Sequence, residues 1–166
     1  MTVETVRAFL ADKAPDIVII DLPTSTATVV LSAEAHGVEP GQIAKSLLLD
    51  AGGRRVMIVT RGDTRLDNQK FKQTFGRRAK MFGPEDVEAA TGHPVGGVCP
   101  FGLASRIPVF CDISLKAFRE VLPAAGSITS AVRIAPERLS QLVDAKWIDV
   151  CRDPDQFEMA NPDSQS

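Results

Sequence analysis

Metal-binding and nucleophilic side chains are scarce in this chain of 166 residues. Its two histidines, His36 and His93, are far apart and show no H-x-x-x-H spacing, which excludes a metal site built on neighbouring histidines. The three cysteines, Cys99, Cys111 and Cys151, form no C-x-x-C pair. Their spacing argues against a disulfide framework or a zinc knuckle and fits a reducing cytoplasm. We therefore predict neither a metal nor a cofactor.

The chain also lacks a basic excess and a long apolar run. A net charge of −2 and a pI near 5.7 exclude a general nucleic-acid coating protein. The N-terminus has no basic segment followed by an apolar one, and no apolar run is long enough to span a membrane. We expect no membrane partner. The composition, 44% hydrophobic and 24% charged, predicts one domain over residues 1–152 and a polar tail over residues 153–166.

Several motifs of common enzyme classes are missing as well. The glycines do not follow a strand in the order G-x-G-x-x-G, and no Walker loop is present, so a nucleotide cofactor loses support. The chain has no G-x-S-x-G elbow, which argues against a serine hydrolase of that type.

Apolar periodicity predicts helices and strands in mixed order. Two β-rich runs, residues 43–50 and 54–60, flank Gly52 and Gly53 and predict a hairpin. Hydroxyl residues at 24–28 precede a helix that Gly37 ends. The order of hairpin and single helices predicts a mixed α/β (α+β) fold that is not doubly wound. Further helices are predicted at 3–12, 67–75, 84–91 and 136–143, and further strands at 17–20, 107–113, 131–134 and 147–150.

Lys45 lies inside an apolar run, residues 43–49. A period of two places it on the same strand face as Ile43, Leu47 and Leu49. An ammonium group in that position either reaches water along its flexible side chain or meets an anion such as phosphate. Both interpretations are open at this stage.

The segment TGHPVGGVCPFG, residues 91–102, contains four glycines and two prolines. Glycine permits positive φ and close backbone approach, while proline fixes φ and removes a donor. Such control of the backbone indicates either a difficult turn or amide groups aimed at a ligand.

Together, residues 41–49 (GQIAKSLLL), residues 91–102 and residues 131–139 (AVRIAPERL) resemble the YbaK/EbsC family of aminoacyl-tRNA deacylases. These are free-standing relatives of the editing insertion in bacterial prolyl-tRNA synthetase. The resemblance covers about residues 3–150. It implies a YbaK-like editing domain whose mixed sheet is curled, barrel-like and surrounded by helices. It also implies a trans-editing hydrolase that deacylates misacylated tRNA without a metal or a covalent intermediate.

The resemblance assigns catalytic roles to Lys45, Gly96, Gly97 and Val98. Lys45 would hold the phosphate of the terminal adenosine of tRNA. Amide groups of the glycine loop would stabilise the negative charge that develops on the ester oxygen. Substrate contacts are predicted for Thr26, Val95, Cys99, Phe101, Asp112 and Ser130, with helix capping as the alternative for Thr26 and a structural role as the alternative for Asp112 and Ser130.

The implied partners are the acceptor end of an aminoacyl-tRNA and a synthetase, with a monomer or a homodimer as the active species. The tRNA would be tRNA-Pro or a related tRNA that carries a small wrong amino acid. His93 and Cys99 stand where an aromatic residue and a serine occur in relatives. The amino acid that would be removed from the tRNA is therefore one of several. These are alanine, 2-aminobutyrate, serine, threonine and cysteine.

Two other functions are open on the sequence alone. The first is a tRNA- or nucleic-acid-binding module without activity, which would use the basic residues of the middle third, although these also fit an ordinary solvated face. The second is a cysteine-dependent hydrolase in which Cys99 pairs with His93, or a redox protein that uses Cys99 or Cys111. The basic residues concerned are Arg54, Arg55, Arg61, Arg65, Lys70, Lys72, Arg77, Arg78 and Lys80.

Overall fold

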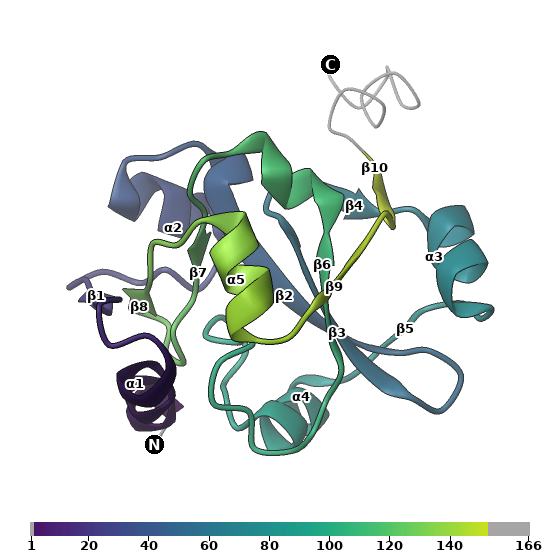
Figure 1. The fold of residues 1–166 in the computed structure, drawn as a ribbon, viewed down its shortest axis with the longest axis horizontal. Coiled ribbons are helices and arrows are strands. Elements are labelled where there is room, and N and C mark those ends of the chain that lie inside the picture. The colour runs from purple at the N-terminus through teal and green to yellow at the C-terminus, as the bar shows by residue number, and fades with distance from the viewer. Residues whose placement is uncertain (1, 153–166) are drawn as a thin grey trace.

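A hairpin of two long strands forms the centre of the computed structural model, which describes residues 2–152 (Figure 1). The strands β2 (Ile43–Asp50) and β3 (Arg55–Arg61) pair antiparallel, with Lys45 opposite Thr60. The turn holds Gly52 and Gly53 at φ values of 70° and 91°, which glycine adopts at little cost. The predicted hairpin is confirmed.

Four shorter strands extend the sheet on both sides of the hairpin. β6 (Val109–Asp112) runs parallel to β3, and β9 (Lys146–Ile148) runs parallel to β6. On the other edge, β7 (Leu122–Pro123) pairs with the start of β2, and β5 (Lys80–Met81) pairs with its end.

The mixed α/β class is therefore confirmed, but the sheet of the described residues is open. Its order runs β5-β2-β3-β6-β9, with β7 beside β2, and β9 does not pair with the opposite edge. The barrel-like curl implied by the resemblance is not found. Closure needs a continuous ladder around the sheet, and two strands of two residues each do not supply one.

Two small two-stranded sheets complete the β structure. β1 (Ile20–Asp21) pairs with β8 (Ser130–Ala131), and β4 (Arg65–Leu66) pairs with β10 (Cys151–Arg152). The strands predicted at 17–20 and 131–134 are thus much shorter than expected. Their apolar residues pack against the main core from irregular backbone, and periodicity does not separate the two cases.

Five α-helices surround the sheet: α1 (Thr2–Lys13), α2 (Val29–His36), α3 (Asn68–Phe75), α4 (Pro84–Thr91) and α5 (Pro136–Leu142). Thr28 caps the start of α2, and Gly37 ends it in the left-handed conformation, as the sequence predicts. Two 3₁₀ turns, η1 (Pro40–Gln42) and η2 (Ile113–Ala117), have no counterpart in the prediction. No helix within residues 2–152 is long and apolar enough to cross a membrane.

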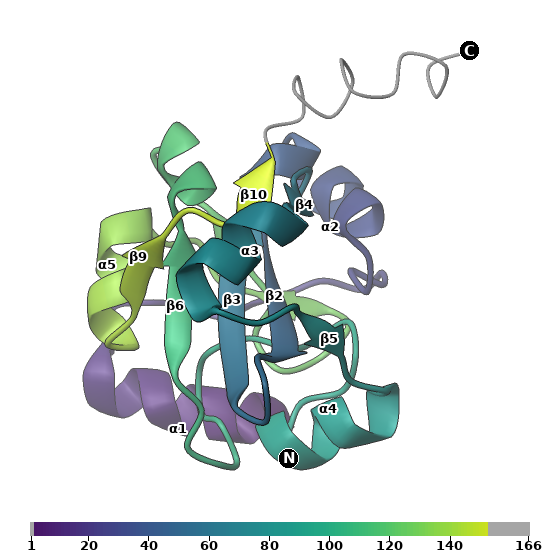
Figure 2. The same cartoon turned by 90° about the vertical axis from the view of Figure 1, so that its right-hand side faces the viewer.

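The two faces of the sheet bury separate cores. Ala44 and Leu48 point into the larger core, together with Val6 of α1 and Leu139 of α5. The odd-numbered residues of β2 from 45 to 49 point the other way, where Leu49, Ile58 and Phe71 pack under α3. Figure 2 shows α3 in front of β2 and β3, on the side away from α1. The predicted tail at 153–166 lies outside the described residues.

Candidate active site

A cavity of about 320 Å³ lies beside β2, where the sheet edge is interrupted. On this edge β7 pairs with residues 43–44 and β5 pairs with residues 49–50. Residues 45–48 therefore have no strand partner on this side within the described part of the chain. Six of the predicted site residues line the cavity: Thr26, Lys45, Val95, Gly96, Val98 and Ser130.

Lys45 is half-buried on the cavity wall, and its Nζ donates a hydrogen bond to the Thr64 carbonyl at 2.5 Å. It forms no ion pair with any residue between 2 and 152. Burial lowers the pKa of Lys45 below its ordinary value, against the opposing effects of Cys151 and Asp63. A half-buried cation that lacks a paired anion has the properties of an anion-binding group.

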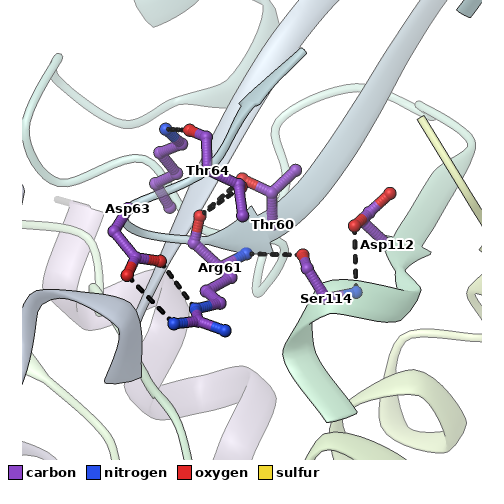
Figure 3. Close-up of polar contacts among 7 residues, drawn as sticks. Thr60, Arg61, Asp63, Thr64, Asp112 and Ser114 are labelled. Atoms are coloured by element: carbon purple, nitrogen blue, oxygen red, sulfur yellow. Dashed lines mark hydrogen bonds and ion pairs between the residues drawn. The ribbon is translucent and has the colours of Figure 1, made fainter. Parts of the chain in front are cut away.

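The turn that supports Lys45 is itself fixed by hydrogen bonds (Figure 3). The Thr64 hydroxyl donates to the Arg61 carbonyl at 2.7 Å, and the Arg61 amide donates to the Ser114 hydroxyl at 3.2 Å. The Ser114 amide in turn donates to Asp112 Oδ2 at 2.9 Å. The Arg61 guanidinium pairs with Asp63 at 2.6 Å. Residues distant in sequence thus hold the carbonyl that receives the lysine.

Asp112 belongs to this support and does not line the cavity beside β2. Its carboxylate is buried and accepts hydrogen bonds from the amides of Ser114 and Val150. It borders a second cavity of about 260 Å³, together with Arg61, Lys70 and Asp149. The predicted substrate contact of Asp112 is not supported by this position.

The glycine loop, residues 93–102, enters the first cavity with Val95, Gly96 and Val98. The Gly97 amide donates to the Pro94 carbonyl at 2.9 Å and closes a tight turn. The amides of Gly96 and Val98 have no hydrogen-bond partner within residues 2–152. The loop thus keeps two unpaired donors, and Gly97, predicted as a third, uses its amide in the turn.

Close backbone contacts explain why glycine occupies positions 96 and 97. A Cβ atom on Gly97 would lie 2.7 Å from the Ser127 amide nitrogen, and the Gly97 carbonyl accepts a hydrogen bond from the Gly126 amide at 3.0 Å. Gly96 has a φ of 93°, and a Cβ there would lie 3.0 Å from the Ala27 Cβ. The glycine loop therefore packs closely against residues 27 and 127.

Cys99 and Phe101 are predicted to touch substrate, but both are fully buried in the main core, away from the cavity. His93 is buried beside them, with Nε2 at 2.7 Å from the Phe101 carbonyl and 3.6 Å from Cys99 Sγ. Burial raises the pKa of the Cys99 thiol to about 12 and lowers the pKa of His93. The buried side chains of His93, Cys99 and Phe101 therefore hold the glycine loop against the main core. Because the Cys99 thiol is buried, it is inaccessible as a nucleophile.

Thr26 and Ser130 also line the cavity, next to the residues that pack against the glycine loop. The Thr26 amide and hydroxyl both donate to the Ile128 carbonyl, at 2.5 and 2.9 Å, and the Ser130 hydroxyl lies 2.8 Å from the Ser127 hydroxyl. Helix capping, the alternative role for Thr26, is performed by Thr28.

Sequence reasoning missed the apolar wall formed by Met81, Phe82 and Val87. Met81 belongs to a strand of only two residues, which leaves no periodic pattern to find. Val87 is one of the apolar residues that recur at helical spacing in α4. That periodicity predicts only an ordinary core residue. Among residues 2–152, no group of three or more histidine, cysteine or acidic side chains is placed to hold a metal ion.

Comparison with known proteins places this arrangement among editing proteins. Residues 24–142 match the family model described as the aminoacyl-tRNA editing domain. The chain is 44% identical to the uncharacterized protein YwhH of Bacillus subtilis over 155 residues, which is 92% of this chain and 99% of that protein. It is 27% identical to EbsC of Enterococcus faecalis, a candidate Cys-tRNA(Pro)/Cys-tRNA(Cys) deacylase, over 71% of this chain and 73% of that protein.

Two further similarities point the same way. The proline–tRNA ligase of Bacillus licheniformis is 35% identical over 104 residues, which is 62% of this chain and 18% of the ligase. The fold matches the crystal structure of a candidate trans-editing enzyme for prolyl-tRNA synthetase with a TM-score of 0.84 and 30% identity, over 92% of this chain and 98% of that chain.

Proposed function

The chain belongs to the aminoacyl-tRNA editing domain family, and from this premise we propose that it is a trans-editing hydrolase that deacylates misacylated tRNA. One observation carries the proposal. Lys45, which forms no ion pair within residues 2–152, lines the same cavity as Gly96 and Val98, whose backbone amides have no hydrogen-bond partner among those residues. The first suits a phosphate, and the second suits an oxygen that becomes negative during ester hydrolysis.

In this mechanism the 3′ end of the tRNA lies in the cavity. The Lys45 ammonium has three donors, one of which is used by the Thr64 carbonyl, so it can also bind the phosphate of the terminal adenosine. The ester carbonyl would then face the amides of Gly96 and Val98. Water adds to the carbonyl carbon and loses a proton, the bond from that carbon to the ribose oxygen breaks, and the ribose oxygen takes up a proton. The amino acid and the free tRNA, with its terminal hydroxyl restored, then leave.

The energetic demand on the protein is small because an aminoacyl ester is already labile. One well-placed oxyanion donor contributes roughly 3 kcal/mol to the stabilisation of the transition state, and orientation of the ester adds to this. The mechanism requires no nucleophilic side chain, which agrees with the burial of Cys99.

The cavity favours a small uncharged amino acid. Its wall is largely apolar, with Val95, Val98, Leu47 and Phe82, and Lys45 is its one charged side chain among the described residues. Lys45 would repel an amino acid with a cationic side chain. An anionic side chain would compete with the substrate phosphate for Lys45. We propose tRNA-Pro or a related tRNA as the carrier, with action in the cytoplasm beside a synthetase.

The other functions receive less support. A cysteine-dependent hydrolase needs an accessible thiolate, whereas Cys99 is fully buried and its thiol pKa is raised to about 12. A binding module without activity would not need unpaired amides in residues that line the same cavity as a lysine.

A deacylation screen tests the proposal. Purified protein would be mixed with tRNA-Pro charged with alanine, 2-aminobutyrate, serine, threonine or cysteine, and the release of amino acid would be followed. Accelerated release from at least one of these substrates is expected. No acceleration with any mischarged tRNA, from folded protein, would contradict the proposal.

A further inference from the structure

Seven of the nine basic residues of the middle third fall into two groups in the structure. Arg61 and Lys70 form ion pairs with Asp63 and Asp149 and border the second cavity. A second group is exposed and forms no ion pair with any residue from 2 to 152. It consists of Arg54, Arg55, Arg77, Arg78 and Lys80, and we call it the hairpin-end cluster.

The members of this cluster come from two chain segments that meet at one end of the sheet. Arg54 and Arg55 follow the β2–β3 turn, Arg77 and Arg78 lie between α3 and β5, and Lys80 is the first residue of β5. The Arg77 side chain packs over the turn, with its Cγ 2.6 Å from where a Cβ on Gly52 would stand. Figure 2 shows the end of the hairpin and β5 next to each other.

One acid partly balances the cluster. Asp50 pairs across the sheet with Arg55 on one side and with Lys80 on the other, so the three side chains form a row. Four positive charges remain in excess. Since the whole chain has a net charge of −2, this concentration stands against an otherwise acidic background.

The cluster adjoins the candidate cavity along the chain, through β5. Lys80 and Met81 are the two residues of β5, and Met81 lines the cavity while 72% exposed. An RNA whose 3′ end entered the cavity would pass the hairpin end with its next phosphates. Exposed arginines without partners suit such phosphates because guanidinium groups bind them in a bidentate way.

We propose that the hairpin-end cluster binds the phosphate backbone of the RNA segment adjoining the 3′ end that occupies the cavity. This inference rests on the proposed function for the identity of the RNA. It assigns the cluster to substrate affinity, with no part in cleavage of the ester. If the hairpin-end cluster were an ordinary solvated face, or if its partner were an acidic protein, RNA binding would not depend on these residues.

The test uses a double variant, Arg54→Glu with Arg78→Glu, and a matched control, Arg119→Glu with Arg133→Glu. The control residues are exposed and form no ion pair within residues 2–152, and neither belongs to the cluster. Binding of an uncharged tRNA-Pro transcript would be measured by fluorescence anisotropy at several salt concentrations. Thermal unfolding would be followed for each protein.

We expect the cluster variant to weaken binding by about tenfold or more and to show a shallower dependence on salt, because fewer phosphates are neutralised. The control should bind like the parent. Hydrolysis of a short substrate, an aminoacyl ester of adenosine 5′-monophosphate, should proceed at the parental rate in both variants.

Equal weakening by the two double variants, or no weakening by the cluster variant, would overturn the inference. So would an equal loss with the short substrate, since that would place the cluster in the cavity chemistry. Because binding of uncharged tRNA requires no cleavage, failure of the proposed function appears separately, as a parent protein that binds tRNA but releases no amino acid. If Arg54→Glu with Arg78→Glu does not fold, the pair of Arg→Gln changes replaces it.

Discussion

The two cavities described above differ in how their lysines are paired. In the second cavity, Lys70 is paired with Asp149 at 3.0 Å and also donates to the Cys151 carbonyl. In the first, Lys45 is half-buried and donates to a neutral carbonyl, and no carboxylate within residues 2–152 forms an ion pair with it.

We infer from this difference that the charge of Lys70 serves the fold, whereas the charge of Lys45 is available to a ligand. The groups around Lys70 satisfy one another, and removal of one partner would affect only local structure. The groups around Lys45 remain incomplete without an external anion, and the glycine loop brings two unpaired amides to the same cavity. Incomplete pairing, more than cavity volume, distinguishes the candidate active site from the second cavity.

The largest effect is expected when each lysine is removed in turn. Lys45→Ala should slow single-turnover deacylation by about 10²-fold or more, because it removes a charge-assisted contact that orients the ester. Lys45→Arg should restore only part of the rate, since arginine is longer and planar. Lys70→Ala, the matched control, should retain the parental rate and lose about 0–1 kcal/mol of stability, as expected for an exposed ion pair. Similar rates for Lys45→Ala and Lys70→Ala would contradict the distinction.

A smaller loss is expected from distortion of the glycine loop. Gly97→Val would place a branched side chain against the Ser127 backbone, only 2.7 Å from its amide nitrogen, and should displace the unpaired amides. The expected loss of rate is about 10-fold to 10²-fold. Cys99→Ala, which alters a buried neighbour of the loop, should stay within about tenfold of the parent. A greater loss for Cys99→Ala than for Gly97→Val in folded proteins would favour the cysteine hydrolase.

The smallest effect concerns pH. Burial lowers the pKa of His93 in the folded protein below the ordinary value of 6.5, so the folded chain keeps this side chain neutral while the unfolded chain binds a proton. Stability should therefore decrease as pH falls below 6.5 toward the folded pKa, and His93→Gln should make that decrease shallower. Chemical unfolding at several pH values measures this. Parallel curves for parent and variant would show that His93 does not contribute.

Local signals in the sequence were sufficient for the hairpin and for the helix ends. Gly52 and Gly53 specify the turn by their conformational freedom, and Thr28 and Gly37 specify the ends of α2 by hydrogen bonding and positive φ. Each of these features depends on neighbours in the chain. The resemblance to the YbaK/EbsC family predicted that the glycine loop and Lys45 belong to one site, and residues of both line one cavity.

The remainder depends on contacts that a single sequence does not encode locally. Cys99 and Phe101 follow Val98 in the same loop, yet irregular backbone turns them into the core. Asp112 lies at the end of a strand as predicted. Its carboxylate, however, supports the turn at Thr64 through a chain of hydrogen bonds. The open sheet edge also follows from the short pairing of β5 and β7, which no periodicity predicts.

The central claim is that Lys45 binds a substrate phosphate, and the most direct measurement compares two short esters. One is an aminoacyl ester of adenosine 5′-monophosphate, and the other is the same ester of adenosine without the phosphate. The parent should hydrolyse the first with a kcat/KM about tenfold or more above the second, and Lys45→Ala should abolish this preference. An equal preference for the phosphate in the parent and in folded Lys45→Ala would contradict the account.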